Sequence, residues 1–67
     1  MGSAPSQGKI LIVEDDRKTA SLVALYLERE GFQTVIAYDG QSALKLARSH
    51  NPIFVILDLI LILLRIG

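Results

Sequence analysis

The chain has 67 residues, of which 51% are hydrophobic and only 6% aromatic, so any core must be largely aliphatic. Seven basic and seven acidic residues give a formal net charge of zero, which removes the electrostatic argument for a nucleic acid or an anionic membrane as partner. The absence of cysteine excludes a disulfide framework and a thiolate metal site. This length corresponds to one small domain or part of one, for which we expect marginal stability.

The first eight residues, MGSAPSQG, carry only small, polar or turn-forming side chains after the methionine. They lack the apolar segment of a secretory signal peptide. We therefore expect residues 1–8 to be a disordered leader or a remnant of cloning, and residues 9–67 to form the folded domain.

The first predicted elements are a strand and a helix. The short apolar run KILIV, at residues 9–13, indicates a buried strand, and the acidic residues 14–16 end it. A helix is expected from about residue 17 to residue 30, with Gly31 directly after its end. The apolar stripe expected to face the core consists of Leu22, Val23, Tyr26 and Leu27, with Thr19 at its edge.

A second strand and a second helix follow in the same order. FQTVIAY, at residues 32–38, predicts a strand, which the pair Asp39 and Gly40 ends. A second helix is expected from about residue 41 to residue 49. Its apolar face is predicted to consist of Ala43, Leu44 and Ala47. A third apolar run begins at Ile53.

The resulting β-α-β-α-β order is typical of parallel strands joined by right-handed helical crossovers. We expect a three-stranded parallel sheet with strand order 2-1-3. Because the winding direction reverses between the two crossovers, the two helices should cover opposite faces of the sheet. The fold class is therefore α/β.

Acidic residues fall where ligands collect in such a fold. Glu14 and Asp15 follow the first strand, and Asp58 lies inside the third apolar run. With strand order 2-1-3, these carboxylates converge at the carboxyl ends of strands one and three, where the winding reverses. Oxygen ligands of this kind suit Mg²⁺, and an aspartate beside Mg²⁺ can act as a nucleophile toward a phosphoryl group.

A structural role for the acids is the alternative. Acidic residues after a strand can simply cap the following helix, and Asp16 is the best placed to do so. Asp58 favours the functional interpretation, since an unpaired carboxylate within an aliphatic strand is costly.

The segments ILIVEDD, GFQTVIAYDGQSAL and NPIFVILDL resemble the receiver domain of bacterial two-component response regulators. The resemblance extends from Lys9 to about Leu61 and covers the N-terminal half of that family's domain. It implies a flavodoxin-like half domain that acts as a phosphoreceiver module in phosphorelay signalling. The EDD form is most similar to the winged-helix transcription-factor subclass.

The resemblance also implies roles for individual residues. Asp58 would be the phosphoacceptor, and Mg²⁺ would be held by Glu14, Asp15 and Asp58, Asp15 directly, with help from the backbone carbonyl of Ile60. A sensor histidine kinase would be the partner of a full-length parent, in the cytoplasm. The chain would accept a phosphoryl group rather than act as an enzyme, and this fragment would bind no nucleic acid.

The sequence departs from the family after Asp58. The family usually reads like DLMLPGxDG at this point, whereas this chain reads DLILILLRIG, in which aliphatic residues replace the turn residues. The strand-four hydroxyl residue and the strand-five lysine of the family also have no counterpart. The resemblance therefore predicts a receiver that is inactive in this form. The alternative is a folded scaffold, engineered or selected, that associates with itself and has no activity of its own; the tail could also be out of frame.

The apolar segment from Ile53 to Ile66 indicates whether a membrane or a second protein chain is the expected partner. Twelve of the fourteen residues from Ile53 to Ile66 are apolar, but the run is interrupted by Asp58 and is shorter than the roughly 20 residues of a membrane span. We therefore expect no membrane insertion. An open apolar strand edge pairs with other chains, so we expect a homodimer through Ile53–Ile66. Residues 60–66 could instead form a short helix over their own sheet.

Overall fold

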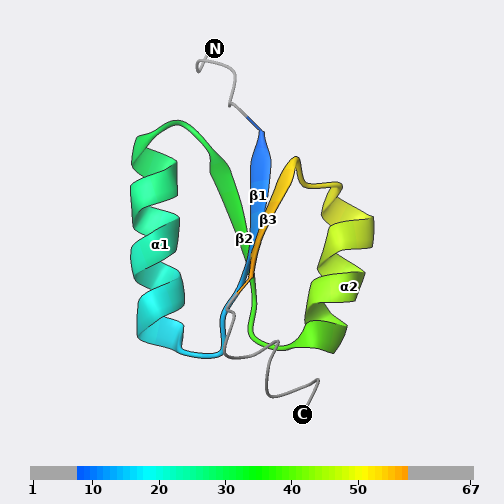
Figure 1. Cartoon of the computed structure of the whole chain (residues 1–67). Helices are drawn as coiled ribbons and strands as arrows, with labels where there is room; N and C mark the ends of the chain where they lie inside the picture. Colours follow the sequence, from blue (N-terminus) through cyan, green and yellow to red (C-terminus); the bar gives the residue numbers. More distant parts are fainter. Residues whose placement is uncertain (1–7, 58–67) are drawn as a thin grey trace.

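The computed structural model describes residues 8–57. Asp58, Ile60, most of the Ile53–Ile66 segment and residues 1–7 of the expected leader lie outside the described residues. The elements are β1 (Lys9–Val13), α1 (Arg17–Arg29), β2 (Gln33–Ala37), α2 (Gly40–His50) and β3 (Phe54–Leu57) (Figure 1). This β-α-β-α-β order confirms the one predicted from hydrophobic periodicity.

The three strands form a parallel sheet in the order β2-β1-β3. Val13, the last residue of β1, lies opposite Ala37, the last residue of β2, and opposite Leu57, the last described residue of β3, so the three lie together at one edge of the sheet. Helix α1 covers one face of the sheet and α2 the other (Figure 1). The predicted strand order and the placement of the helices on opposite faces are both confirmed.

The ends of both helices follow from local sequence. Asp16 caps α1 and Asp39 caps α2, each accepting a hydrogen bond from the backbone N–H three residues later. Gly31 adopts a φ of 97° just after α1, which is the left-handed conformation expected of a glycine at that position. Asn51 ends α2 in the same region, with a φ of 52°.

The core lies on both faces of the central strand. Leu11 and Val13 are buried with Ala37 on the α2 side, where partly buried residues of β2 and α2 pack against them. Side chains alternate along a strand, so Ile10 and Ile12, which are also buried, face α1. The partly buried residues on the α2 side are Val35, Ala43, Leu46 and Ala47.

The predicted apolar stripe of α1 is wrong in two of its members. Leu22 and Tyr26 are 52% and 58% exposed, whereas the buried residues of α1 are Ala20 and Ala24. The small alanine side chains let the helix lie close to the sheet. Because Leu22 and Tyr26 are large and apolar, the predicted face is rotated around the helix axis from the buried face by about 100°, the angle between successive residues.

The apolar face predicted for α2 needs a similar correction. Leu44 is exposed, while Leu46, which the prediction omitted, packs against the core. Ala43 and Ala47 face the core as expected. Ala43 and Ala47 therefore mark the packed face of α2 better than Leu44 does.

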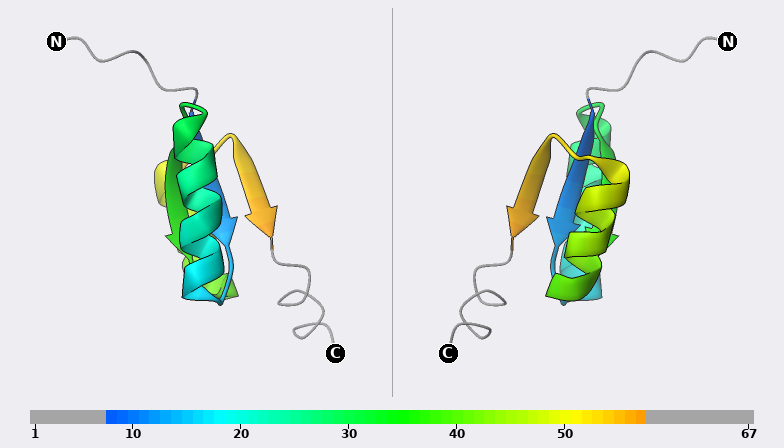
Figure 2. Two further views of the ribbon diagram at one scale, coloured as in Figure 1. Left: turned by 90° about the vertical axis from the view of Figure 1, so that its left-hand side faces the viewer. Right: turned by 90° about the vertical axis from the view of Figure 1, so that its right-hand side faces the viewer.

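Strand β3 lies at the edge of the sheet, beyond the two helices (Figure 2). All four of its residues are exposed, although all are apolar. The N–H of Ile53 donates to the carbonyl of Lys9 at 2.8 Å. Because successive residues of a strand direct their backbone groups to alternate sides, Phe54 and Ile56 direct theirs away from β1. In the part of the chain that is described, β3 therefore presents an open edge.

Two further findings concern the start of the described range and the length of its helices. Gly8, which we assigned to the leader, already contributes to the sheet, since its carbonyl accepts the N–H of Gln33 at 2.9 Å. Within residues 8–57, no helix is both long and apolar enough to cross a membrane.

Candidate acidic site at the carboxyl edge of the sheet

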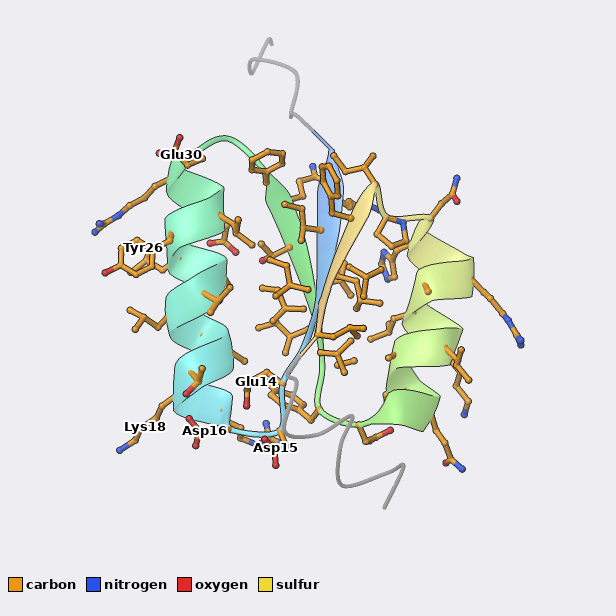
Figure 3. All side chains as sticks on the ribbon, in the orientation of Figure 1. Glu14, Asp15, Asp16, Lys18, Tyr26 and Glu30 are labelled. Atoms are coloured by element: carbon orange, nitrogen blue, oxygen red, sulfur yellow. The ribbon has the colours of Figure 1, made fainter. Side chains whose placement is uncertain are left out.

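The predicted site lies on the loop that joins β1 to α1. Figure 3 shows Glu14 beside the end of β1, and Asp15 and Asp16 on the loop that leads to the helix. The backbone N–H of Glu14 donates to the carbonyl of Ala37 at 3.0 Å, so the loop leaves the sheet while still bonded to the end of β2. The fold therefore places this loop at the edge where parallel sheets bind ligands.

Asp16 is occupied as the cap of α1. Its Oδ2 atom accepts the backbone N–H of Thr19 at 2.8 Å and the hydroxyl of Thr19 at 2.6 Å. The hydrogen bond from the Thr19 hydroxyl and then that from its backbone hold the pKa of Asp16 below its ordinary value. The structural interpretation of the acidic cluster therefore holds for this residue.

Glu14 and Asp15 differ in burial and in the hydrogen bonds that their carboxylates accept from the described residues. Glu14 is half-buried, and its Oε1 atom accepts the backbone N–H of Asp16 at 3.1 Å. Asp15 is exposed, and its carboxylate has no hydrogen bond or ion pair with the other described residues. Of the three acids, Asp15 is the one best placed to bind a cation directly.

The complete predicted ligand set cannot be assembled from the described range. Asp58 and Ile60 lie beyond Leu57, the last described residue. Among residues 8–57, no group of three or more His, Asp or Glu side chains converges where a metal ion could bind. The structure brings Glu14 and Asp15 to one edge and gives no position for the other two.

One contact at this edge was not predicted from the sequence. The Cζ atom of Arg17 lies 4.2 Å from the centroid of the Tyr38 ring. Arg17 is the first residue of α1, and Tyr38 directly follows β2. The signal was available in principle, because the predicted strand ends place both residues at the same edge of the sheet.

Comparison with known proteins agrees with this arrangement. The family profile described as "Response regulator receiver domain" matches residues 10–63. The chain is 40% identical over 53 residues to the alkaline phosphatase synthesis transcriptional regulatory protein PhoP of Bacillus subtilis, covering 79% of this chain and 22% of that protein. It is 40% identical to SphR of Synechococcus elongatus, a protein of the same description, over 68 aligned positions, with 88% of this chain and 26% of that protein covered.

A third relative is the DNA-binding response regulator MtrA of Mycobacterium tuberculosis H37Rv, which is 42% identical over 53 residues, with 79% of this chain and 23% of that protein covered. The chain thus spans about a quarter of the length of these curated relatives. No solved structure matches it significantly. The profile match over most of the chain, together with the acidic loop at the carboxyl edge of a 2-1-3 parallel sheet, places this chain in the response regulator receiver domain family.

Proposed function

We propose that this chain is a phosphoreceiver module in which Asp58 accepts the phosphoryl group and Glu14, Asp15 and Asp58 hold Mg²⁺, assisted by the backbone carbonyl of Ile60. The observation that carries this proposal is the parallel register of β1 and β3, which sets Leu57 opposite Val13. Asp58 and Glu14 are the next residues in the sequence after this pair. In the sequence, each acid therefore directly follows one of two residues that lie opposite each other at the ligand-binding edge.

The donor set fits Mg²⁺ chemically. Carboxylate and carbonyl oxygens are the hard ligands that this ion prefers, and Mg²⁺ usually keeps several waters beside one or two carboxylates. The exposed carboxylate of Asp15 can bind it without breaking a hydrogen bond seen among residues 8–57. Glu14 is already engaged, since its Oε1 atom accepts the N–H of Asp16, so we assign it a role through water and Asp15 the direct one. When bound, Mg²⁺ would offset the negative charge of the carboxylates and of the incoming phosphoryl group.

In the proposed step, an Asp58 carboxylate oxygen bonds to phosphorus while the bond between phosphorus and the donor breaks, and the donor leaves with that electron pair. The donor would be a phosphohistidine on a sensor histidine kinase acting on a longer parent protein. The module is an acceptor in this scheme and not an enzyme.

We further propose that the transfer is weak in this chain alone. A cationic side chain beside the phosphoryl group would stabilise the transferring charge. Lys9 begins β1 at the opposite end of the strand from the acidic loop. Lys18 points away from the sheet (Figure 3). Lys45 is exposed on α2. None of these three lysines is placed to supply that charge at the acidic loop, and the guanidinium of Arg17, which begins α1 next to that loop, is stacked on the Tyr38 ring.

The test is incubation with acetyl phosphate and Mg²⁺, followed by intact-mass analysis. We expect an adduct that is well below one phosphate per chain, that requires Mg²⁺, and that disappears in Asp58→Asn. An equal adduct in Asp58→Asn would contradict the assignment of the acceptor, and an adduct that forms equally in excess EDTA would contradict the role of Mg²⁺. A full stoichiometric adduct would show that the chain needs no further cationic group.

A second candidate function is self-association as an inert scaffold through the Ile53–Ile66 segment. It is favoured by the open edge of β3, on which four consecutive apolar residues are exposed and no charged residue discourages pairing. An antiparallel pairing of two such strands about a two-fold axis would satisfy both edges at once. We expect a dimer by light scattering that persists without Mg²⁺. The double variant Ile62→Pro with Leu63→Gly should restore turn residues and weaken the dimer; an unchanged mass would exclude an extended strand as its basis.

A further inference from the structure

The contact between Arg17 and Tyr38 links the two crossovers of the fold. Arg17 opens α1, and Tyr38 stands between the end of β2 and Asp39, the cap of α2. The guanidinium lies over the face of the ring, with 4.2 Å between Cζ and the ring centroid. A cation over an aromatic face at this distance is attracted by the negative charge density of the ring. The loop after β1 is thereby tied to the corner after β2.

A second bond spans the same gap. The N–H of Glu14 donates to the carbonyl of Ala37, the residue just before Tyr38. The acidic loop is therefore attached to the end of β2 on both sides of Asp15, by main chain at Glu14 and by side chain at Arg17. Of these two attachments, only that of Arg17 can be removed without altering the loop backbone or its carboxylates.

The ring also determines where the positive charge of Arg17 lies. Two carboxylates, those of Asp15 and Asp16, are its close neighbours in the sequence, and a released guanidinium would be attracted to them. An ion pair with Asp15 would compete with a bound cation for the same oxygens. Stacking on Tyr38 provides the guanidinium with a different partner.

We infer that Arg17 is a positioning residue for the acidic site, which acts through Tyr38 to hold the loop of residues 14–16 against β2 and to keep its own charge off Asp15. This inference rests on the proposed function insofar as Mg²⁺ is the ligand of the site. It assigns no contact between Arg17 and the metal or the phosphoryl group.

Electrostatics alone predicts the opposite result for the key substitution. Arg17→Gln removes a positive charge near a cation site, and loss of charge repulsion would tighten Mg²⁺ binding. A positioning role predicts weaker binding, because the loop loses one attachment. Tyr38→Leu keeps the charge and removes the ring, so it should weaken binding as well, whereas Tyr38→Phe keeps the ring face and should not.

The experiment is an NMR titration with MgCl₂ that follows the backbone amides of residues 14–17 in the unchanged chain and in each variant. We expect the dissociation constant for Mg²⁺ to rise about threefold in Arg17→Gln and in Tyr38→Leu, as suits an exposed cation–π contact, and to stay unchanged in Tyr38→Phe. Lys18→Gln is the matched control, since it removes the same charge from the next residue, which has no ring partner among residues 8–57. The affinity of this variant for Mg²⁺ should be equal or slightly higher. Tighter binding in Arg17→Gln, or no change in Tyr38→Leu, would overturn the inference.

Metal-free spectra separate this inference from the proposed function. The side-chain protons of Arg17 should show ring-current shifts in the unchanged chain and in Tyr38→Phe, and lose them in Tyr38→Leu. Absence of these shifts while Mg²⁺ still binds would overturn the role of Arg17 alone. Their presence in a chain that binds no Mg²⁺ would overturn the proposed site, and with it the metal-related role of Arg17.

Discussion

Leu57 of β3 lies opposite Val13 of β1 in a parallel register. In the sequence, Glu14 directly follows Val13, and Asp58 directly follows Leu57. A single backbone register therefore relates the two residues that precede these acids in the sequence.

The first prediction compares two neighbouring acids. Asp15→Asn should weaken Mg²⁺ binding at least about tenfold, because it removes a full charge from a proposed direct ligand. Asp16→Asn should leave the affinity nearly unchanged, since the Asp16 carboxylate already accepts two hydrogen bonds from Thr19. Calorimetric titration with MgCl₂ measures both. Equal losses in the two variants would argue for a diffuse acidic surface instead of a defined site.

The second prediction concerns the acid side of the stability profile. Hydrogen bonds from Thr19 lower the pKa of Asp16 on folding from its ordinary value of 3.8. A carboxyl with a lowered folded-state pKa adds stability that is fully present above the unfolded value and is lost as the pH falls through the folded value. The unchanged chain should therefore melt above Asp16→Asn at pH 6, and this difference should shrink as the pH falls below 3.8.

Circular dichroism melts at several pH values measure that difference. Thr19→Val removes the hydroxyl that is the larger cause of the shift, so it should reduce the pH dependence while leaving the Asp16 carboxylate in place. A gap between the unchanged chain and Asp16→Asn that stays constant from pH 6 to pH 2.5 would rule out the cap as its source.

The third prediction tests which face of α1 is buried. Ala20 has no exposed surface, so Ala20→Leu should overpack the contact with the sheet and cost about 1–3 kcal/mol of unfolding free energy. Leu22→Ala removes a larger side chain from an exposed position and should change it by no more than about 0.5 kcal/mol. Urea denaturation measures both values. The reverse ranking would restore the face that hydrophobic bulk alone predicted.

The fourth prediction concerns the open edge of β3. Phe54→Lys places a charge on the exposed strand and should shift the proposed dimer toward monomer in light scattering. Leu44→Lys is the control, since Leu44 on α2 is 61% exposed and Phe54 is 63% exposed, so the two changes differ mainly in location. A similar loss of dimer in both variants would point to general solubility instead of edge pairing.

Much of the fold was accessible from the sequence. Short apolar runs, acidic or glycine residues at their ends, and the alternation of strand and helix predicted the element order, the strand order and the helix placement. Strand β1 was predicted at residues 9–13, as found. These features depend on the spacing of apolar residues and on the residues at the ends of each strand and helix, both of which can be read directly from the sequence.

The burial of single side chains was less accessible. Ala20 and Ala24 face the sheet because their small side chains allow the helix to approach it closely. A hydrophobicity pattern ranks side chains by apolar character and does not predict how closely a helix can pack. The contact between Arg17 and Tyr38 joins residues from different crossovers, so it depends on the tertiary fold. The role of Asp16 as a cap could be anticipated, whereas the positions of Asp58 and Ile60 lie outside the described residues.

The central place of β1 has a consequence for the order in which the protein can be completed during synthesis. The strand made first bonds to β2 on one side and to β3 on the other. Its partner at Ile10 in β3 is Phe54, so the ribosome must release almost all of the described chain before β1 has neighbours on both sides. Until then β1, which carries the buried core residues 10–13, has at most one neighbouring strand, and a chaperone that recognises extended aliphatic segments would have its longest access at residues 9–13.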